Sequence, residues 1–364
     1  MTARALVVGA GPAGLSAALQ LKTWVDDVHV AEASSREGFC SVGEHLPPAA
    51  LKLLCALGLG RLLENPAHTR SSGVSSAWGT DSWADRDYFF SAAGKGINLR
   101  RPVFDAALMR HAEDHGVALL HDTRLVGLSQ STGGFSANLR EPDTKTTERY
   151  DVVVDATGRQ ARAARMLGAS VKRFDRLIGV VGRVTGAPAQ SDAGRLFIEA
   201  VEQGWWYAVQ FENGDIVTVF MTDADLLPDC GGSARDAWHQ GLRQSRRLAA
   251  LLEIGNLPTG VEVFTAMTQQ TIAPNLEGFI AVGDAAYAFD PLSSWGIAKG
   301  LSDGHAGAAA LKAHALGDVS AVSAFSDERH VSFSNYLAQY SDFYLSEMRW
   351  PDAPFWHRRH MELT

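Results

Sequence analysis

The stretch that decides the fold is ALVVGAGPAGLSAAL, residues 5–19. A short apolar strand runs into a glycine-rich turn, and a helix of small residues follows it. Gly9 permits the tight turn, Gly11 leaves room for a pyrophosphate to reach the backbone, and Gly14 lets the helix pack against the strand. This order of strand, turn and helix predicts a nucleotide-binding unit of the α/β class.

A carboxylate follows at the distance that such a unit needs. The second apolar strand, VHVAEA (28–33), carries Glu32, 18 residues beyond Gly14. There a carboxylate can accept hydrogen bonds from an adenosine ribose. The alternative is a glycine-rich turn beside an unrelated surface Glu, which leaves the ordered series unexplained. We therefore expect a bound dinucleotide.

Two later segments favour FAD over a nicotinamide as the resident dinucleotide. DVVVDATGR (151–159) is an apolar strand that runs into Gly158, and FIAVGDAAYAFDP (279–291) is a third strand, which ends at Gly283 and Asp284. Three close backbone approaches, spread over most of the chain, suit a long ligand held in extended form.

Composition argues against several other classes of protein. The formal net charge is −8, and no long basic run is present, so a nucleic-acid partner is not expected. Three scattered cysteines, without a CxxC pair, predict neither a disulfide framework nor a metal site. His111 and His115 are four residues apart, but HAEDH lacks the Glu that follows the first His in zinc hydrolases. The first strand begins close to Met1, and no run of about 18 apolar residues occurs, which predicts a cytoplasmic protein without a membrane span.

The motifs together resemble the glutathione-reductase-type FAD proteins of the aromatic-hydroxylase and flavin-dependent-halogenase superfamily. The resemblance spans nearly the whole chain and is carried by GAGPAG, Glu32, VGEHLPP (42–48), LRRPVFDAALMRHAEDHGV (99–117), DATGRQARAAR (155–165) and GDAAYAFDPLSSWGI (283–297). Within this superfamily the chain is most similar to the flavoprotein monooxygenases of tryptophylquinone cofactor biogenesis. They share WWY (205–207) and a tail like RWPDAPFW (349–356).

The resemblance implies an α/β fold with a Rossmann-like FAD-binding domain and an antiparallel β-sheet substrate domain. The expected FAD-binding domain is discontinuous and comprises residues 1–70, 97–175 and 269–330. Residues 71–96 and 176–268 would form the substrate domain, and residues 331–364 a C-terminal helical closing segment. Alternating apolar positions and the Asn213–Gly214 turn support the antiparallel sheet. Its expected strands are LIGVVGRVTG (177–186), RLFIEAV (195–201), GWWYAVQFE (204–212), DIVTVFMTD (215–223) and GVEVFTAMT (260–268).

The same resemblance assigns candidate cofactor contacts. Asp284 would bond the ribityl chain, and Pro291 to Ile297 would lie along the isoalloxazine ring, where a helix beginning at Gly296 offers free backbone N–H groups. The alternative for Asp284 is a helix cap. Arg101 is favoured over its neighbour Arg100 as a contact to the flavin or its phosphates, ahead of a helix expected over 104–120; the alternative is a surface arginine. The cofactor-binding candidates are Gly9, Gly11, Ala13, Gly14, Glu32, Arg101, Asp155, Gly158, Gly283, Asp284, Pro291, Gly296 and Ile297.

The catalytic candidates are Glu44, His45 and Trp295. Glu44 either acts in the reaction, by orienting water or taking a substrate proton, or caps the helix after Pro47 and Pro48. Trp295 lies in a loop between Ser294 and Gly296 and is the candidate for substrate gating. Cys40 lies either near the flavin ring or in the core as a small hydrophobe. The substrate candidates Trp205, Trp206 and Tyr207 either line an aromatic cage or pack in the core.

The predicted function is that of an FAD-dependent monooxygenase that hydroxylates an electron-rich aromatic ring through a peroxyflavin. By resemblance, the substrate is a Trp residue of a partner protein during tryptophylquinone cofactor biogenesis. The alternatives are a hydroxylase of a small aromatic or indole metabolite, a non-catalytic flavin-containing maturation factor, and a flavin-dependent halogenase. The halogenase reading is weakened because GVSSAWG (73–79) has no Lys before its Trp and because WxWxIP is missing. O2 would be the oxidant. Electrons would come from NADH or NADPH, bound near Arg159, Arg162 and Arg165, or from a separate flavin reductase.

Overall fold

The computed structural model of the chain describes residues 3–34, 42, 44–91, 94–188, 192–228, 232–253, 258 and 260–361. The candidate Cys40 lies outside these residues.

A five-stranded parallel sheet forms the first layer, in the order β20-β12-β1-β2-β8. The sequence predicted three of its strands after the first: the segments at 28–33, 151–155 and 279–283. The carboxyl ends of parallel strands meet at one edge of a sheet, so the turns after β1, β12 and β20 come together. The strands are β1 (Arg4–Val8), β2 (Asp27–Ala31), β8 (Ala118–Leu120), β12 (Val152–Asp155) and β20 (Phe279–Ala281).

A second, seven-stranded sheet has the order β18-β14-β17-β16-β15-β5-β6. Its pairs are antiparallel except for β15 and β5, which run parallel. All five strands expected from the sequence are present. Gly214 has a φ of +86° in the turn between β16 and β17, as the Asn-Gly pair predicted. The strands are β5 (Gly73–Ala77), β6 (Ala84–Asp87), β14 (Leu177–Val184), β15 (Leu196–Val201), β16 (Gly204–Gln210), β17 (Ile216–Asp223) and β18 (Val261–Thr265).

Three small antiparallel sheets complete the β structure. The first contains β9 (Arg124–Ser131), β10 (Gly134–Arg140) and β11 (Lys145–Tyr150). The second contains β13 (Ser170–Arg173), β19 (Gln269–Ile272) and β21 (Tyr287–Ala288). The third contains β3 (His45–Leu46), β4 (Thr69–Ser71) and β7 (Gly96–Asn98).

Helices α1 and α7 lie against each other beside the parallel sheet. A Cβ on Gly304 of α7 would lie 2.0 Å from the carbonyl oxygen of Ala13, so this glycine allows the close approach. In the described part of the chain, no helix is both long enough and apolar enough to cross a membrane. The helices are α1 (Pro12–Leu21), α2 (Pro48–Ala56), α3 (Arg101–Asp114), α4 (Arg162–Met166), α5 (Ala234–Gln244), α6 (Arg247–Glu253), α7 (Gly296–Ala315), α8 (Ala321–Leu345) and α9 (Pro354–Met361).

The helix expected over 104–120 is shorter than predicted. Helix α3 ends at Asp114, and Gly116 takes a φ of +82°, a left-handed conformation that stops a helix. Residues 118–120 form the edge strand β8 instead. The apolar residues of this segment are divided between α3 and β8, so the prediction of one continuous helix was wrong.

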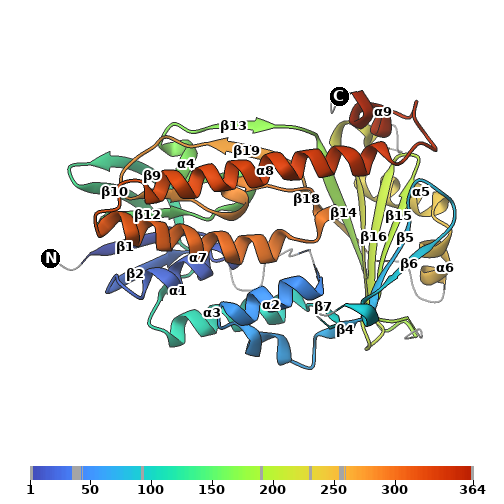
Figure 1. Cartoon of the computed structure of the whole chain (residues 1–364), viewed down its shortest axis with the longest axis horizontal. Helices are drawn as coiled ribbons and strands as arrows, with labels where there is room; N and C mark the ends of the chain where they lie inside the picture. The colour runs from blue at the N-terminus through green and yellow to red at the C-terminus, as the bar shows by residue number, and fades with distance from the viewer. Residues whose placement is uncertain are drawn as a thin grey trace.

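Helix α8 joins the two sheets. Figure 1 shows it lying alongside α7 and continuing toward the seven-stranded sheet, where α9 also packs. Tyr340, Tyr344 and Trp356 from these two helices share a buried cluster with Trp205 of β16. The other face of the sheet is covered by α5 and α6, where Trp206 packs. Both faces of the central strands β15, β16 and β17 are therefore buried, whereas the edge strands β6 and β18 are largely exposed.

Candidate active site

In the glycine-rich turn after β1, two glycines have no room for a Cβ atom and a third one has free space there. Gly9 has a φ of +103°, and a Cβ there would lie 2.5 Å from the carbonyl oxygen of Ala156. A Cβ on Gly14 would lie 1.9 Å from the carbonyl oxygen of Gly9. At Gly11, no atom lies within 4 Å of the Cβ position. Gly9 and Gly14 are therefore needed by the backbone itself, whereas Gly11 leaves free space at the N-terminus of α1.

Glu32 holds this turn in place. Its Oε2 accepts a hydrogen bond from the backbone N–H of Ala10 at 2.8 Å, and its Oε1 accepts one from Ser34 at 2.8 Å. The side chain is nearly buried. The carboxylate thus fixes the turn relative to β2, a contact that the sequence did not reveal. Its bond to a ribose stays a prediction.

A cavity of about 280 Å³ lies at the carboxyl edge of the parallel sheet and reaches the seven-stranded sheet. Gly11, Gly158 and Gly296 all face it, and none has an atom within 4 Å of its Cβ position. Three segments distant in sequence therefore expose bare backbone to one space. The predicted site residues that line it are Gly11, Ala13, His45, Arg101, Gly158, Tyr207, Asp284, Pro291, Gly296 and Ile297.

Two helix N-termini open into this cavity. Neither Gly11, the N-cap of α1, nor Trp295, the N-cap of α7, makes a side-chain capping bond. The first backbone N–H groups of both helices are therefore available to a ligand, at the positive ends of the helix dipoles. A pyrophosphate and the electron-rich side of a reduced flavin are ligands of this kind, so the residues present fit FAD.

Asp284 is engaged by cations and does not act as a helix cap. Its Oδ2 accepts a hydrogen bond from Arg159 at 2.7 Å, and Lys299 lies 3.5 Å from its Oδ1. Arg159 also donates to the carbonyl oxygen of Phe289 at 2.6 Å. Arg159 therefore ties the turn after β20 to the turn after β12, and it lines the cavity itself.

Two predicted cofactor contacts support the backbone around the cavity. Asp155 is fully buried, and its carboxylate accepts bonds from Thr157 and from the N–H of Ala164 at 2.7 Å. Burial raises the pKa of Asp155 against these hydrogen bonds. Gly283 has a φ of +59°, and a Cβ there would lie 2.8 Å from Ala13. Direct contact of either residue with a cofactor stays a prediction.

The neighbouring residues Arg100 and Arg101 make different contacts. Arg101 lines the cavity, donates to the carbonyl oxygen of Val42 at 2.6 Å and pairs with Asp105. Arg100 pairs with Asp215 at 2.6 Å and stacks over a phenylalanine of the seven-stranded sheet domain. Of the two, Arg101 is thus the arginine that lines the cavity, and its contact with a flavin stays a prediction.

His45 is a neutral side chain with a defined tautomer. Asn98 donates its amide to Gly194 at 2.6 Å and presents its Oδ1 to the His45 Nδ1 at 2.8 Å, so Nδ1 carries the proton. The bare Nε2 accepts from the hydroxyl of Tyr88 at 3.0 Å. Burial lowers the pKa of His45 to about 4. Both ring nitrogens are occupied, so His45 lines the cavity as a fixed neutral ring.

Glu44 and Tyr207 form a reciprocal pair. The Tyr207 hydroxyl donates to Oε2 of Glu44 at 2.6 Å and accepts from the Glu44 backbone N–H at 3.0 Å. Burial, together with the adjacent carboxylate, raises the pKa of Tyr207 well above its usual value. Glu44 therefore fixes the ring of Tyr207 at the cavity wall and does not cap α2, whose N-cap is Pro47.

The remaining aromatic candidates lie elsewhere. Trp205 donates its indole N–H to Tyr344 at 2.9 Å, and Trp206 packs on Trp238 across the other face of the sheet. Both are buried, so the alternative of core packing describes them, and Tyr207 alone of the three lines the cavity. Trp295 is 38% exposed, next to Ser294 and Gly296, which do line it.

Several cavity residues escaped the sequence reading. The sequence does not single most of them out, because an apolar residue on a buried strand cannot be distinguished from an ordinary core residue. Asp290 is different, since an Asp before Pro at a strand end reads as a turn former. The missed lining residues include Val219, Met221, Phe264, Phe289 and Asp290.

A second, wider depression of about 780 Å³ adjoins the cavity and shares Gly158, Arg159 and Asp284 with it. Arg162, Arg165 and Arg173 also line it. Within the described residues, none of these three is ion-paired with a carboxylate. The depression is therefore a positively charged surface beside the proposed FAD site.

Comparison with known proteins places the chain in a family. Residues 2–335 match the family described as FAD binding domain. The putative FAD-dependent oxidoreductase LodB of Marinomonas mediterranea is 27% identical over 364 residues, which cover 98% of this chain and 96% of that protein.

Two solved structures share the fold over almost the whole chain. The flavin-dependent halogenase CmlS superimposes with a TM-score of 0.87 at 21% identity and covers 99% of this chain and 68% of its own. The peptidyl tryptophan dihydroxylase QhpG, essential for tryptophylquinone cofactor biogenesis, superimposes with a TM-score of 0.80 at 23% identity, covering 99% and 79%. The chain therefore belongs to the FAD binding domain family and is an FAD-dependent oxidoreductase.

Proposed function

We propose that the protein is an FAD-dependent monooxygenase that hydroxylates the indole ring of a Trp residue carried by a partner protein. The observation that carries the proposal is the composition of the apolar part of the cavity wall. It combines Tyr207 with Val219, Met221, Phe264 and Phe289, and no lysine is among its described lining residues. An apolar wall suits a flat aromatic ring.

The choice of a protein-borne substrate has separate support. QhpG, which shares the fold over almost the whole chain, is a peptidyl tryptophan dihydroxylase by name. Trp295 stands partly exposed beside the cavity, where it would meet an incoming segment of a partner and limit which rings enter. A small free aromatic substrate remains the alternative that the experiment below separates.

When bound and reduced, FAD supplies two electrons to O2, so that one oxygen atom enters the ring and the other leaves as water. The protein's own residues hold and orient the reactants. Gly11, Gly158 and Gly296 give FAD access to the backbone, Arg159 fixes Asp284 for the ribityl chain, and the Glu44–Tyr207 pair keeps the cavity wall rigid. The apolar wall excludes water from the ring.

The electron donor is proposed to be NADH or NADPH, which would place its phosphates in the depression lined by Arg162, Arg165 and Arg173. Arginines suit phosphate because they donate two parallel hydrogen bonds. Anaerobic mixing with each nucleotide should bleach the flavin absorbance. An R165Q/R173Q double variant should need at least about tenfold more nucleotide, because two charged contacts are lost. If neither nucleotide bleaches the flavin, a separate flavin reductase is the donor.

Reduced enzyme mixed with O2 and a Trp-containing peptide tests the main proposal. We expect a peptide that gains oxygen, as read by mass spectrometry, and better turnover with peptide than with free indole. Efficient hydroxylation of indole alone would favour a small-metabolite enzyme. Incorporation of chlorine when chloride is added would favour the halogenase reading, which the CmlS likeness supports. Oxidation of neither substrate, with the flavin bound, would favour a non-catalytic maturation factor.

A further inference from the structure

A glycine of the seven-stranded sheet leaves a gap in the cavity wall, and the ring of Phe264 fills it. Gly179 of β14 is paired with Phe264 of β18 on one side and with Met221 of β17 on the other. Phe264 and Met221 both line the cavity, together with Val219. A Cβ on Gly179 would lie 2.2 and 2.3 Å from Cε1 and Cζ of Phe264, and 3.0 Å from Val219. The aromatic ring therefore covers the bare glycine and takes the place of its side chain.

The gap lies on the face of the sheet that meets the cavity. Successive side chains of a strand point to opposite faces. Val181, two residues after Gly179, shares its face and packs in one apolar cluster with Met221. Gly182 has the opposite orientation, because a Cβ there would lie 2.9 Å from Trp238, on the face that α5 covers. The same strand thus carries one glycine toward the cavity and one away from it.

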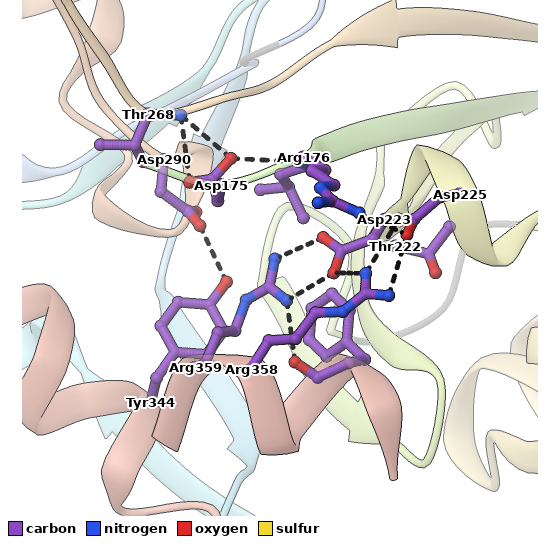
Figure 2. A network of polar contacts seen from close by, with 12 residues as sticks. Asp175, Arg176, Thr222, Asp223, Asp225, Thr268, Asp290, Tyr344, Arg358 and Arg359 are labelled. Carbon is purple, nitrogen blue, oxygen red and sulfur yellow. Dashed lines mark hydrogen bonds and ion pairs between the residues drawn. The ribbon is translucent and has the colours of Figure 1, made fainter. Parts of the chain in front are cut away.

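The backbone around Gly179 is held on both sides. β14 is hydrogen-bonded to β17 and to β18, and its first residue, Leu177, lies opposite Asp223 at the end of β17. Arg359 donates to both oxygens of Asp223, at 2.8 and 3.1 Å, and Arg358 donates to it at 3.1 Å. Figure 2 shows both arginines reaching Asp223 from α9. These contacts fix the end of β17 two residues beyond Met221.

The ring of Phe264 is the part of this arrangement that can move. β18 is an edge strand, Phe264 is only partly buried, and the atoms nearest Gly179 are at the far end of its side chain. Side chains of a strand stand roughly perpendicular to the sheet. A methyl group at position 179 would therefore push the ring away from the sheet and into the cavity, by more than about 1 Å, to restore an ordinary carbon–carbon contact.

We propose that Gly179 determines which aromatic rings the cavity accepts, by setting the position of the Phe264 ring. The inference rests on the proposed monooxygenase function and adds the size of its substrate: two fused rings, as in the indole of a Trp residue. Without a side chain at position 179, the Phe264 ring stays close to the sheet and leaves the cavity wide. Gly179 is a positioning residue, since it acts through Phe264.

Binding of indole and of phenol to the oxidised, FAD-loaded protein tests the proposal without turnover. Isothermal titration calorimetry measures both affinities. G179A should weaken indole binding at least about tenfold and phenol binding by less than about threefold, because two fused rings need the space that the Phe264 ring then occupies. The matched control G182A adds the same methyl group on the other face of the sheet. It should lower the urea midpoint of unfolding but leave both affinities unchanged.

The double variant G179A/F264A shows whether the glycine acts through the ring. F264A removes the ring, so adding G179A to it should change the affinity for indole by less than about twofold. A similar tenfold loss in both backgrounds, or equal losses for indole and phenol in G179A, would overturn the proposal. A wild-type protein that binds neither ring overturns it as well. If G179A does not fold, F264A decides: it should shift the ratio of affinities at least about fivefold from indole toward the larger 5-methoxyindole, and an unchanged ratio overturns the proposal.

Turnover separates this inference from the proposed function. If the affinities follow the expected pattern but the reduced protein hydroxylates no ring, the selection of rings by Gly179 stands and the monooxygenase proposal has failed. If the wild type hydroxylates a Trp peptide, G179A should raise the KM for that peptide at least about tenfold with kcat nearly unchanged, because the ring is excluded before the reaction. A lower kcat at an unchanged KM would contradict the inference while leaving the proposed function intact.

Discussion

Replacing Gly11 and Gly14 separately distinguishes a glycine that serves a ligand from a glycine that serves the fold. Gly11 has φ −73° and ψ 177°, which alanine adopts freely, and its Cβ would meet no atom within 4 Å. The free energy of unfolding of apo G11A should therefore stay within about 1 kcal/mol of the wild type. Its affinity for FAD should fall at least about tenfold, or about 1.4 kcal/mol, because the new methyl group occupies space at the N-terminus of α1.

Gly14 should behave in the opposite way. A Cβ there would lie 1.9 Å from the carbonyl oxygen of Gly9, so the backbone must shift. G14A should lose about 3 kcal/mol of stability as the apoprotein. Urea unfolding of the apoproteins and titration with FAD, followed by flavin fluorescence, measure the two quantities. Normal FAD binding by G11A, or unfolding of apo G11A at much lower urea, would refute the assignment of Gly11 to the cofactor.

Three further predictions concern other parts of the molecule. R359M should lower the free energy of unfolding by about 3 kcal/mol, since it leaves the buried Asp223 without its main partner, whereas R246M, at an exposed pair, should leave it nearly unchanged. His45 has its pKa lowered to about 4 from 6.5, so the unfolded chain binds a proton that the folded one refuses, and stability falls as the pH drops through this range. H45Q should remove this loss, which amounts to about 3 kcal/mol in all, as measured by urea unfolding at a series of pH values; an unchanged pH slope would contradict it. W295A should leave FAD affinity and stability unchanged while altering the KM for a Trp peptide more than that for free indole, in steady-state kinetics; equal changes for both substrates would argue against a gate.

The sequence was most informative where chemistry is local. The turn after β1 needs Gly9, Gly11 and Gly14 within six residues of one another, and the strands that lead to Gly158 and Gly283 are short apolar runs next to them. Each of these features can be read from a few neighbouring residues, because backbone clashes and strand ends are local properties.

Long-range contacts were not predictable in the same way. Every residue of β16 is buried, so the alternation that assigns faces is lost, and the sequence could not tell that Tyr207 faces the cavity while Trp205 and Trp206 do not. Asp290 owes its environment to Tyr344, 54 residues away, and to Arg359 in the last helix. The unusual environment of this carboxyl group can be recognised only once the packing of α8 and α9 against the sheet is known.

A single turnover with isotope-labelled O2 tests the central claim most directly. The FAD-loaded protein would be reduced without oxygen, mixed with a Trp-containing peptide and exposed to the labelled gas, and the peptide would be mapped by mass spectrometry. The claim predicts a labelled oxygen atom on the indole ring of the Trp residue and a second labelled atom in water. A peptide that stays unlabelled while the flavin is reoxidised, or one that gains chlorine from added chloride, would contradict it.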